Sequence, residues 1–199
     1  MALKVIVFDF DGTLIESNCL KFDTFFELFP PDKFHNLIIK NVLKDFLEES
    51  RYVILKEILK RIDRRISKHE DIELKSEELA KGYNLIVTNG AKKCNEKSGA
   101  SEVLVSLSKR YKLYLSSTTP ETSLKEIVKH RKWEGFFCGI FGYPNDKTSV
   151  LFDIIKRESI IPDELLVVGD GKSDKDSANS AKCRFFQIDN DSSLIELLD

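Results

Sequence analysis

The sequence lacks paired cysteines. Its 199 residues include four cysteines, and no two of them form a CxxC pair. They are Cys19, Cys94, Cys138 and Cys183. Scattered cysteines without a secretory context do not indicate a disulfide framework. We therefore predict reduced, mostly buried cysteines and a cytoplasmic location.

The sequence also lacks long apolar runs and an excess of charge of either sign. No apolar stretch approaches the length of a membrane span, and the N-terminal apolar run carries no signal-peptide cleavage site. With 31 basic and 33 acidic side chains the net charge is −2, so no basic bias points to nucleic acid. We expect neither a membrane nor a nucleic-acid partner. The length suits one domain with an insertion.

The most informative stretch is Lys4–Thr13, which reads KVIVFDFDGT. Its short apolar run ends at a glycine, which predicts a buried strand. Asp9 and Asp11 stand where the strand ends, and Gly12 lets the chain turn away. Two carboxylates this close repel each other, so they indicate a cation, a shared proton or a salt bridge. The alternative is an ordinary solvated turn, because Asp and Gly are common turn residues.

A long helical stretch follows this strand. From Cys19 to about His69 the apolar residues recur at helical spacing, and no alternating pattern interrupts them. We interpret its aromatic stripe, Phe22, Phe25, Phe26 and Phe29, as core, although it could line a substrate pocket. We interpret its basic face, at 56–68, as solvated, although such a face could attract an anionic partner. The stretch Asn84–Ala91 fits either a helix or a strand ending at Thr88. We favour the helix, because its apolar residues share one side.

From Ser101 onward, apolar strands alternate with amphipathic helices. The strands are predicted at Lys112–Ser116, Phe136–Phe141, Leu165–Val168 and Arg184–Ile188, and the helices include Glu121–His130, Val150–Arg157, Ser177–Ala181 and Ser193–Leu198. This alternation predicts an α/β fold with a doubly wound parallel sheet. The first strand must join that sheet. We therefore predict a core domain of residues 1–16 and 99–199 and an inserted α-helical domain of residues 17–98.

Polar side chains follow three of the predicted strands. Asp9 and Asp11 follow the first, Ser116, Ser117 and Thr118 the second, and Asp170 and Asp174 the third. Parallel strands end at one edge of a sheet, so these groups can converge there, together with Lys147 at a helix start. An all-oxygen carboxylate site suits Mg²⁺. The alternatives are that Asp170 and Asp174 cap a helix and that Lys147 is a surface lysine.

These residues resemble the motifs of the haloacid dehalogenase-like (HAD) hydrolase superfamily, specifically its phosphatase branch. DFDGT resembles the first motif, the serine after a hydrophobic strand the second, Lys147 the third and GDGKSD the fourth. The resemblance implies a Rossmann-like HAD core with a helical cap inserted between motifs one and two. For motif two, Ser116 and Thr88 compete with Ser117. We prefer Ser117, because it precedes Pro120 by three residues, as the family's residue precedes its helix-opening proline.

The resemblance also implies roles. Asp9 would be the nucleophile that forms an aspartyl-phosphate. Asp11 would protonate the leaving oxygen and then activate water. Mg²⁺ would be held by Asp9, the backbone carbonyl of Asp11, and Asp170, with Asp174 as a ligand or as an orienting group for Lys147. The substrate-binding residues would be Gly12, Thr13, Ser117, Thr118 and Lys147.

The implied function is Mg²⁺-dependent hydrolysis of a small phosphorylated metabolite. One alternative is a phosphomutase, which uses the same core residues. A second is a non-catalytic binding protein that uses the basic helix.

Overall fold

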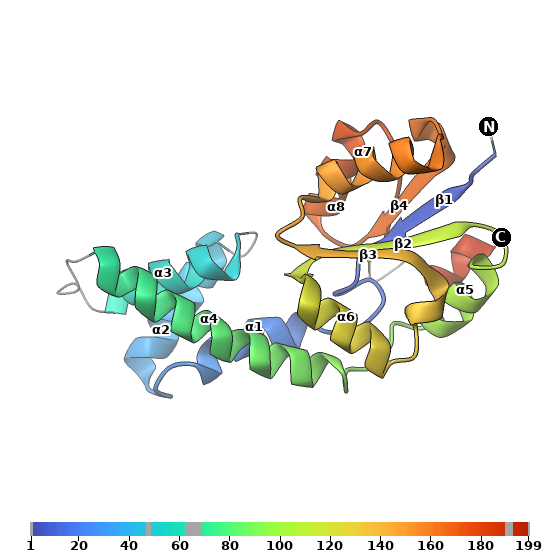
Figure 1. Ribbon diagram of the computed structural model, residues 1–199. Helices are drawn as coiled ribbons and strands as arrows, with labels where there is room; N and C mark the ends of the chain where they lie inside the picture. The colour runs from blue at the N-terminus through green and yellow to red at the C-terminus, as the bar shows by residue number, and fades with distance from the viewer. Residues whose placement is uncertain (1, 47–48, 63–68, 190–192, 199) are drawn as a thin grey trace. The chain divides into compact units, whose positions relative to one another are not determined.

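The computed structural model describes residues 2–46, 49–62, 69–189 and 193–198 (Figure 1). The chain divides into two compact units, which are described separately. The first comprises Met1–Asn18 and Ala91–Asp199, and the second comprises Cys19–Gly90.

The first unit is built on a five-stranded sheet. Its strands are β1 (Val5–Phe8), β2 (Lys112–Pro120), β3 (Phe137–Tyr143), β4 (Leu165–Gly169) and β5 (Arg184–Gln187). They lie in the order β3-β2-β1-β4-β5, and every neighbouring pair is parallel. All four residues of the central strand β1 are buried, which explains its uninterrupted apolar sequence. The prediction of a doubly wound parallel sheet is confirmed.

Helices cover both faces of this sheet (Figure 1). On one face lie α7 (Lys147–Glu158) and α8 (Lys172–Ser180), and on the other lie α5 (Ala100–Leu107) and α6 (Glu121–His130). The unit also contains the 3₁₀ segments η1 (Glu134–Phe136), η2 (Pro162–Glu164) and η3 (Leu194–Leu198). A buried cluster that includes Val5, Val7, Leu151 and Ile154 joins β1 to α7. This core holds the carboxyl end of β1 in a fixed position.

Within the described residues, the second unit contains four helices. They are α1 (Asn18–Glu27), α2 (Lys33–Phe46), α3 (Arg51–Ile62) and α4 (His69–Ala91). Its core contains Phe25 of the predicted aromatic stripe, with Phe26 and Phe29 packed against it, whereas Phe22 is exposed. The stretch Asn84–Ala91 is helical, as predicted.

The unit boundaries differ from the predicted ones. The helical unit ends at Gly90, eight residues before the predicted boundary, and begins at Cys19 rather than residue 17. The reason is that the returning chain hydrogen-bonds to the core: Glu16 N donates to Asn95 O at 2.9 Å and Lys97 N donates to Leu14 O at 3.0 Å. These bonds fix residues 91–98 to the first unit.

Other elements also differ from the sequence predictions. Strand β2 continues to Pro120 instead of ending at Ser116, and α8 begins at Lys172 instead of Ser177. The last predicted helix is the 3₁₀ segment η3. The prediction of mostly buried cysteines is wrong: all four are free, but Cys19 and Cys138 are exposed and Cys94 and Cys183 are only partly buried.

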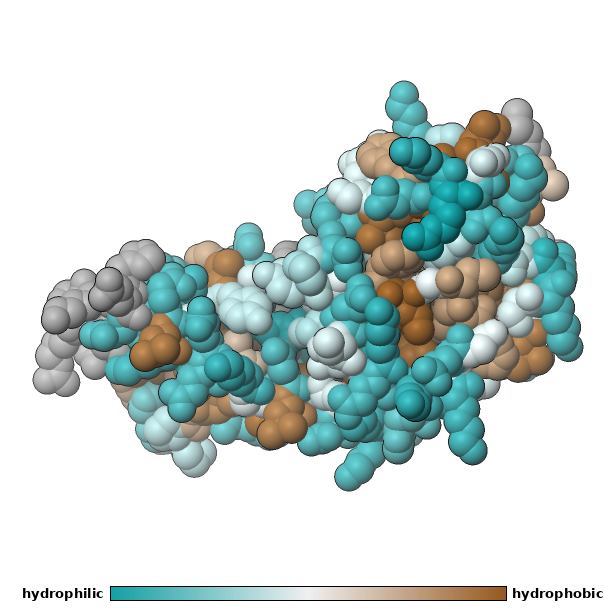
Figure 2. Space-filling view, in the orientation of Figure 1, coloured by the Kyte–Doolittle hydropathy of each residue, from teal (hydrophilic) through white to brown (hydrophobic). Residues whose placement is uncertain are grey.

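The surface adds two observations. Hydrophobic residues reach the surface along β3 (Figure 2). This strand lies at the edge of the sheet beside β2, and its sequence contains no charged residue. In the part of the chain that the structure describes, no helix has the length and apolarity needed to traverse a membrane.

Candidate active site

Asp9 follows the central strand directly and is 6% exposed. Its backbone N–H donates to Val168 O of β4 at 2.8 Å, which extends the sheet pairing by one residue. Its Oδ1 accepts a hydrogen bond from Lys147 Nζ at 2.7 Å. The carboxylate therefore stands at the edge of the sheet where ligands bind in this architecture.

Lys147 is the first residue of α7, and only 11% of its side chain is exposed. Asp146 caps the helix by accepting from Ser149 N at 2.9 Å, which fixes where α7 begins. The Lys147 ammonium contacts Asp174 Oδ1 at 2.6 Å in addition to Asp9. Lys147 is therefore a buried cation shared by two carboxylates, rather than a surface lysine.

Asp170 follows β4 directly and is held by Thr13, in the loop after β1, and by Asn18, the first residue of α1. Thr13 Oγ1 donates to its Oδ1 at 3.3 Å, and Asn18 Nδ2 donates to its Oδ2 at 2.9 Å. Gly12 has a φ of +80°, and a Cβ there would lie 2.0 Å from Asp170 Oδ2. A glycine is thus required both for the turn and for the approach of Asp170. Thr13 and Gly12 are predicted substrate-binding residues, yet here they orient a carboxylate.

Asp174 lies in the first turn of α8 and is 3% exposed. Its Oδ2 accepts from Gly171 N at 3.2 Å, so it does cap the helix, as the alternative interpretation held. Its Oδ1 contacts Lys147 at the same time. The Asp174 side chain therefore both caps α8 and binds Lys147 in the site. A Cβ on Gly169 would lie 2.4 Å from Asp174 Cγ, so the preceding strand end must remain small.

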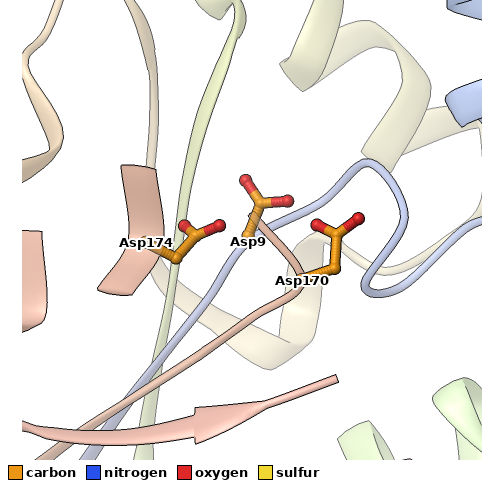
Figure 3. Close-up of side chains that lie close together, drawn as sticks. All are labelled: Asp9, Asp170 and Asp174. Atoms are coloured by element: carbon orange, nitrogen blue, oxygen red, sulfur yellow. The ribbon is translucent and has the colours of Figure 1, made fainter. Parts of the chain in front are cut away.

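Asp9, Asp170 and Asp174 form one acidic cluster (Figure 3). Each offers a carboxylate oxygen, and these oxygens all lie within 4.8 Å of one another. Lys147 contacts two of the three carboxylates, Asp9 and Asp174, so with all three ionised the negative charge of the cluster exceeds the charge of that ammonium. Hard oxygen donors of this number and spacing fit a divalent cation such as Mg²⁺.

The ionisation of the cluster is strongly perturbed. Burial raises the pKa of Asp9 to about 7, with Lys147 opposing and Asp174 and Asp11 adding to the rise. Burial likewise raises the pKa of Asp174. Burial acts to lower the pKa of Lys147, but the Asp9 and Asp174 carboxylates outweigh it and hold that pKa above its usual value. A cation in the cluster would favour the charged carboxylates.

Asp11 has a different environment from Asp9. The acidic cluster found among the described residues does not include it. Its Oδ1 accepts from Ser17 Oγ at 2.6 Å, and its Oδ2 accepts from Thr119 Oγ1 at 2.7 Å and from Ser117 Oγ at 3.3 Å. Three hydroxyl groups thus hold the Asp11 carboxylate. Only the backbone carbonyl of this residue was expected to bind the metal.

The two candidate serines of motif two point to different groups. Ser117 contacts Asp11, whereas Ser116 lines a small buried cavity with Asp9, Lys147 and Asp174. This difference follows from the alternation of side chains along β2. Thr88, the other rival, lies within α4 of the helical unit and not at a strand end. Thr118, a predicted substrate-binding residue, is exposed on β2.

Three side chains with contacts in the site had no assigned role in it: Ser17, Asn18 and Thr119. The contacts of Ser17 and Asn18 depend on the loop geometry of residues 9–18, which has no periodic signal. Thr119 was missed because β2 was predicted to end at Ser116. The two β-branched residues Thr118 and Thr119 were the available signal that the strand continues.

A larger cavity of about 470 Å³ lies at the opposite, amino ends of β1 and β2. Its lining includes Lys4, Arg110, Lys112 and Glu158. Lys4 is paired with Glu164 at 2.8 Å, and Lys112 is paired with Glu158. Size alone therefore does not identify the reactive site, because the chemistry-bearing groups converge at the other edge.

Gly12→Ala is expected to raise the Mg²⁺ concentration needed for half-saturation by about 10-fold or more. The reason is that the substitution would displace Asp170 and the Asn18 side chain that orients it. The added Cβ would collide with Asp170 Oδ2 and Asn18 Nδ2, and the positive φ adds strain. Isothermal titration with Mg²⁺ measures the change. Gly135→Ala is the matched control, because a Cβ there meets nothing within 4 Å. Equal Mg²⁺ affinity in both variants would contradict the assignment of Asp170.

Known proteins resemble this chain in sequence pattern and in fold. The family model described as haloacid dehalogenase-like hydrolase matches residues 6–188. Among solved structures, the proposed HAD hydrolase YfnB of Bacillus subtilis, bound to magnesium, has a TM-score of 0.70 and 15% identity, covering 98% of this chain and 92% of its own. No curated protein shows a significant match.

Two further structures are similar to the same extent. A predicted phosphoglycolate phosphatase from Haemophilus somnus has a TM-score of 0.70 and 18% identity, covering 98% of this chain and 90% of its own. A proposed β-phosphoglucomutase from Thermotoga maritima has a TM-score of 0.66 and 19% identity, with coverages of 98% and 91%. At these identities the likeness concerns the fold.

Proposed function

Because the chain belongs to the haloacid dehalogenase-like hydrolase family, we propose that it hydrolyses a small phosphomonoester with Asp9 as the nucleophile. The observation that carries the proposal is the position of Asp9. Its carboxylate is buried at the carboxyl edge of the sheet, 2.7 Å from the Lys147 ammonium and within one cluster with Asp170 and Asp174. A carboxylate can attack a phosphoryl group only where positive charge offsets their repulsion. Lys147 supplies one such charge, and a cation held by the cluster would supply the rest.

The cofactor of the proposed reaction is Mg²⁺, held by Asp9, Asp170 and Asp174. Bound there, the ion would neutralise negative charge on the phosphoryl oxygens. The excess of carboxylates over ammonium groups in the cluster supports this choice, as does the oxygen-only ligand set. Thr13 and Asn18 orient Asp170 for the task through their hydrogen bonds.

The chemistry divides into two steps. An Asp9 oxygen attacks phosphorus, the bond from phosphorus to the leaving oxygen breaks, and Asp11 gives that oxygen a proton. Water then attacks the phosphorus of the aspartyl-phosphate, Asp11 takes a proton from the water, and the Asp9 carboxylate leaves. Lys147 and Ser117 bind phosphoryl oxygens throughout, which offsets charge and keeps the transfer in line.

The helical unit Cys19–Gly90 is proposed to act as the cap of this enzyme. It is compact and has its own core, so it can move as one body. A cap excludes water from the reacting groups and contributes contacts to the substrate. We accordingly propose a small phosphorylated metabolite as the substrate class.

The alternative of a binding protein that uses a basic helix has less support. Lys56, Lys60 and Arg61 of α3 pair with Glu73, Glu57 and Asp45 at 2.5, 2.6 and 3.5 Å. Paired side chains offer less net charge to an anionic partner. The remaining predicted basic residues, Arg64, Arg65 and Lys68, lie outside the described residues.

The test is turnover of 4-nitrophenyl phosphate by the purified protein with Mg²⁺ and with a chelator. We expect Mg²⁺-dependent release of inorganic phosphate in amounts equal to 4-nitrophenol. A phosphomutase would instead release less phosphate than phenol when a sugar acceptor is present. Absence of turnover in Mg²⁺, at the level of Asp9→Asn, would overturn the proposal.

A further inference from the structure

Two hydroxyl groups of β2 hold one oxygen of the Asp11 carboxylate, and Ser17 holds the other oxygen. Thr119 Oγ1 donates to Asp11 Oδ2 at 2.7 Å, and Ser117 Oγ donates to the same oxygen at 3.3 Å. The backbone N–H of Thr119 in turn donates to Ser117 Oγ at 3.1 Å. Thr119 therefore acts on Asp11 twice, once through its own hydroxyl and once by orienting Ser117.

The position of Thr119 is well suited to this task. Its side chain is 3% exposed, and it belongs to the part of β2 that continues beyond the pairing with β1, which ends at Phe8 and Leu115. The pairing of β2 with β3 is irregular between Ser116 and Pro120. A local irregularity re-aims side chains, and here the hydroxyl is aimed across the sheet edge at Asp11.

A carboxylate two residues from Asp9 needs such a restraint. The cluster of Asp9, Asp170 and Asp174 would attract a cation, and a cation attracts every nearby carboxylate. If Asp11 swung toward that cation, it would no longer be placed to exchange a proton with the leaving oxygen. Buried hydroxyl donors oppose that movement, because a buried donor left without a partner loses its hydrogen bonds to water without any replacement.

We propose that Thr119 is a positioning residue, whose hydroxyl holds the Asp11 carboxylate where it can deliver and accept protons. The inference rests on the proposed phosphatase function. It adds a residue that has no place in the four motifs. It also predicts which kinetic steps depend on Thr119: protonation of a basic leaving group and hydrolysis of the aspartyl-phosphate, but not the attack of Asp9 on phosphorus.

The experiment compares Thr119→Val, which keeps the shape and removes the hydroxyl, with Thr119→Ser, which keeps the hydroxyl. The substrates are phenyl phosphate and 4-nitrophenyl phosphate, which have similar shapes. Phenolate is a strongly basic leaving group that departs well only when protonated, whereas 4-nitrophenolate departs readily without a proton. The value of kcat/KM reports the steps through departure of the leaving group, and kcat includes hydrolysis of the aspartyl-phosphate.

For Thr119→Val we expect kcat/KM to fall about 10-fold or more with phenyl phosphate and less than about 3-fold with 4-nitrophenyl phosphate, within the range of acid–base effects. With 4-nitrophenyl phosphate, kcat and KM should fall together as the aspartyl-phosphate accumulates. Thr119→Ser should restore all values to within about 3-fold of the original protein. Thr122→Val, at an exposed position of α6, is the matched control and should change nothing.

The outcomes separate the two proposals. If the unaltered protein turns over neither substrate with Mg²⁺, the proposed function fails. If the unaltered protein turns over both substrates but Thr119→Val lowers kcat/KM equally for the two, the function stands and the role of Thr119 fails. The same conclusion follows if Thr119→Ser does not restore kcat/KM for phenyl phosphate. Should Thr119→Val not fold, Thr119→Ala removes the same hydroxyl. For that variant too, kcat/KM should fall more with phenyl phosphate than with 4-nitrophenyl phosphate.

Discussion

Replacing Asp9 by asparagine is expected to abolish turnover and, at the same time, to raise the melting temperature of the metal-free protein. The loss of activity follows from the removal of the nucleophile, and we expect a fall of about 10⁴-fold or more in kcat. The gain in stability follows from the surroundings of Asp9, where burial raises its pKa from 3.8 to about 7. Function and stability should therefore change in opposite directions.

The pH dependence gives the sign of the stability effect. The pKa of Asp9 is higher in the folded chain than in the unfolded chain, so between about pH 4 and pH 7 the folded state binds a proton that the unfolded state has released. Stability consequently falls as the pH rises through this window, and the full penalty is present above about pH 7. Asparagine does not ionise, so the variant should not show this fall.

Thermal denaturation in a chelator at pH 5 and pH 8 measures the prediction. At pH 8 the variant should melt about 2–6 °C above the unaltered protein, because roughly 1–2 kcal/mol is regained and Lys147 keeps an amide oxygen as partner. At pH 5 the difference should shrink. Asp153→Asn, at an exposed position of α7, is the control and should alter neither activity nor melting. A variant that melts lower than the unaltered protein at pH 8 would contradict the assigned environment of Asp9.

Added Mg²⁺ should reverse the order of the two melting temperatures. At a given concentration, a ligand that binds only the folded state stabilises it more the tighter it binds. Asparagine is a weaker ligand for a hard cation than a carboxylate. The unaltered protein should therefore gain more from Mg²⁺ than Asp9→Asn does. This part of the prediction tests the cation site without any measurement of turnover.

The parts of this site that could be predicted from the sequence are those attached to regular elements. Asp9 and Asp170 each follow a short apolar strand, and Lys147 opens an amphipathic helix, so a parallel sheet brings all three to one edge. Their approach follows from topology alone. The hydrophobic pattern specifies that topology because both faces of β1 are buried.

The parts that could not be predicted depend on irregular backbone. The positive φ of Gly12 and the turn after it decide that Thr13 and Asn18 reach Asp170 and that Ser17 reaches Asp11. No periodic pattern encodes such contacts. The unit boundary at Gly90 was missed for the same reason, because two backbone hydrogen bonds, from Glu16 and Lys97, tie the returning chain to the core.

Removing the ammonium group of Lys147 should lower the stability of the protein more than any of the other substitutions does. Lys147→Met preserves the length of the side chain but leaves Asp9 and Asp174 without the ammonium that lies 2.7 and 2.6 Å from their oxygens. Breaking a buried ion pair from one side costs about 3–5 kcal/mol, because the remaining charge stays buried. For a chain of this size the melting temperature should fall by about 10 °C at pH 8 in a chelator.

The loss should depend on pH and on Mg²⁺ in ways that a packing defect would not. At pH 5 the carboxylates of Asp9 and Asp174 hold protons more readily because their pKa values are raised, so the fall in melting temperature should be smaller. Mg²⁺ should recover part of it by supplying positive charge, while turnover stays lost. Lys125→Met, which breaks the exposed pair with Glu121, is the control and should shift melting by less than about 2 °C. If Lys147→Met were equally destabilising at both pH values, its contribution would be packing rather than charge.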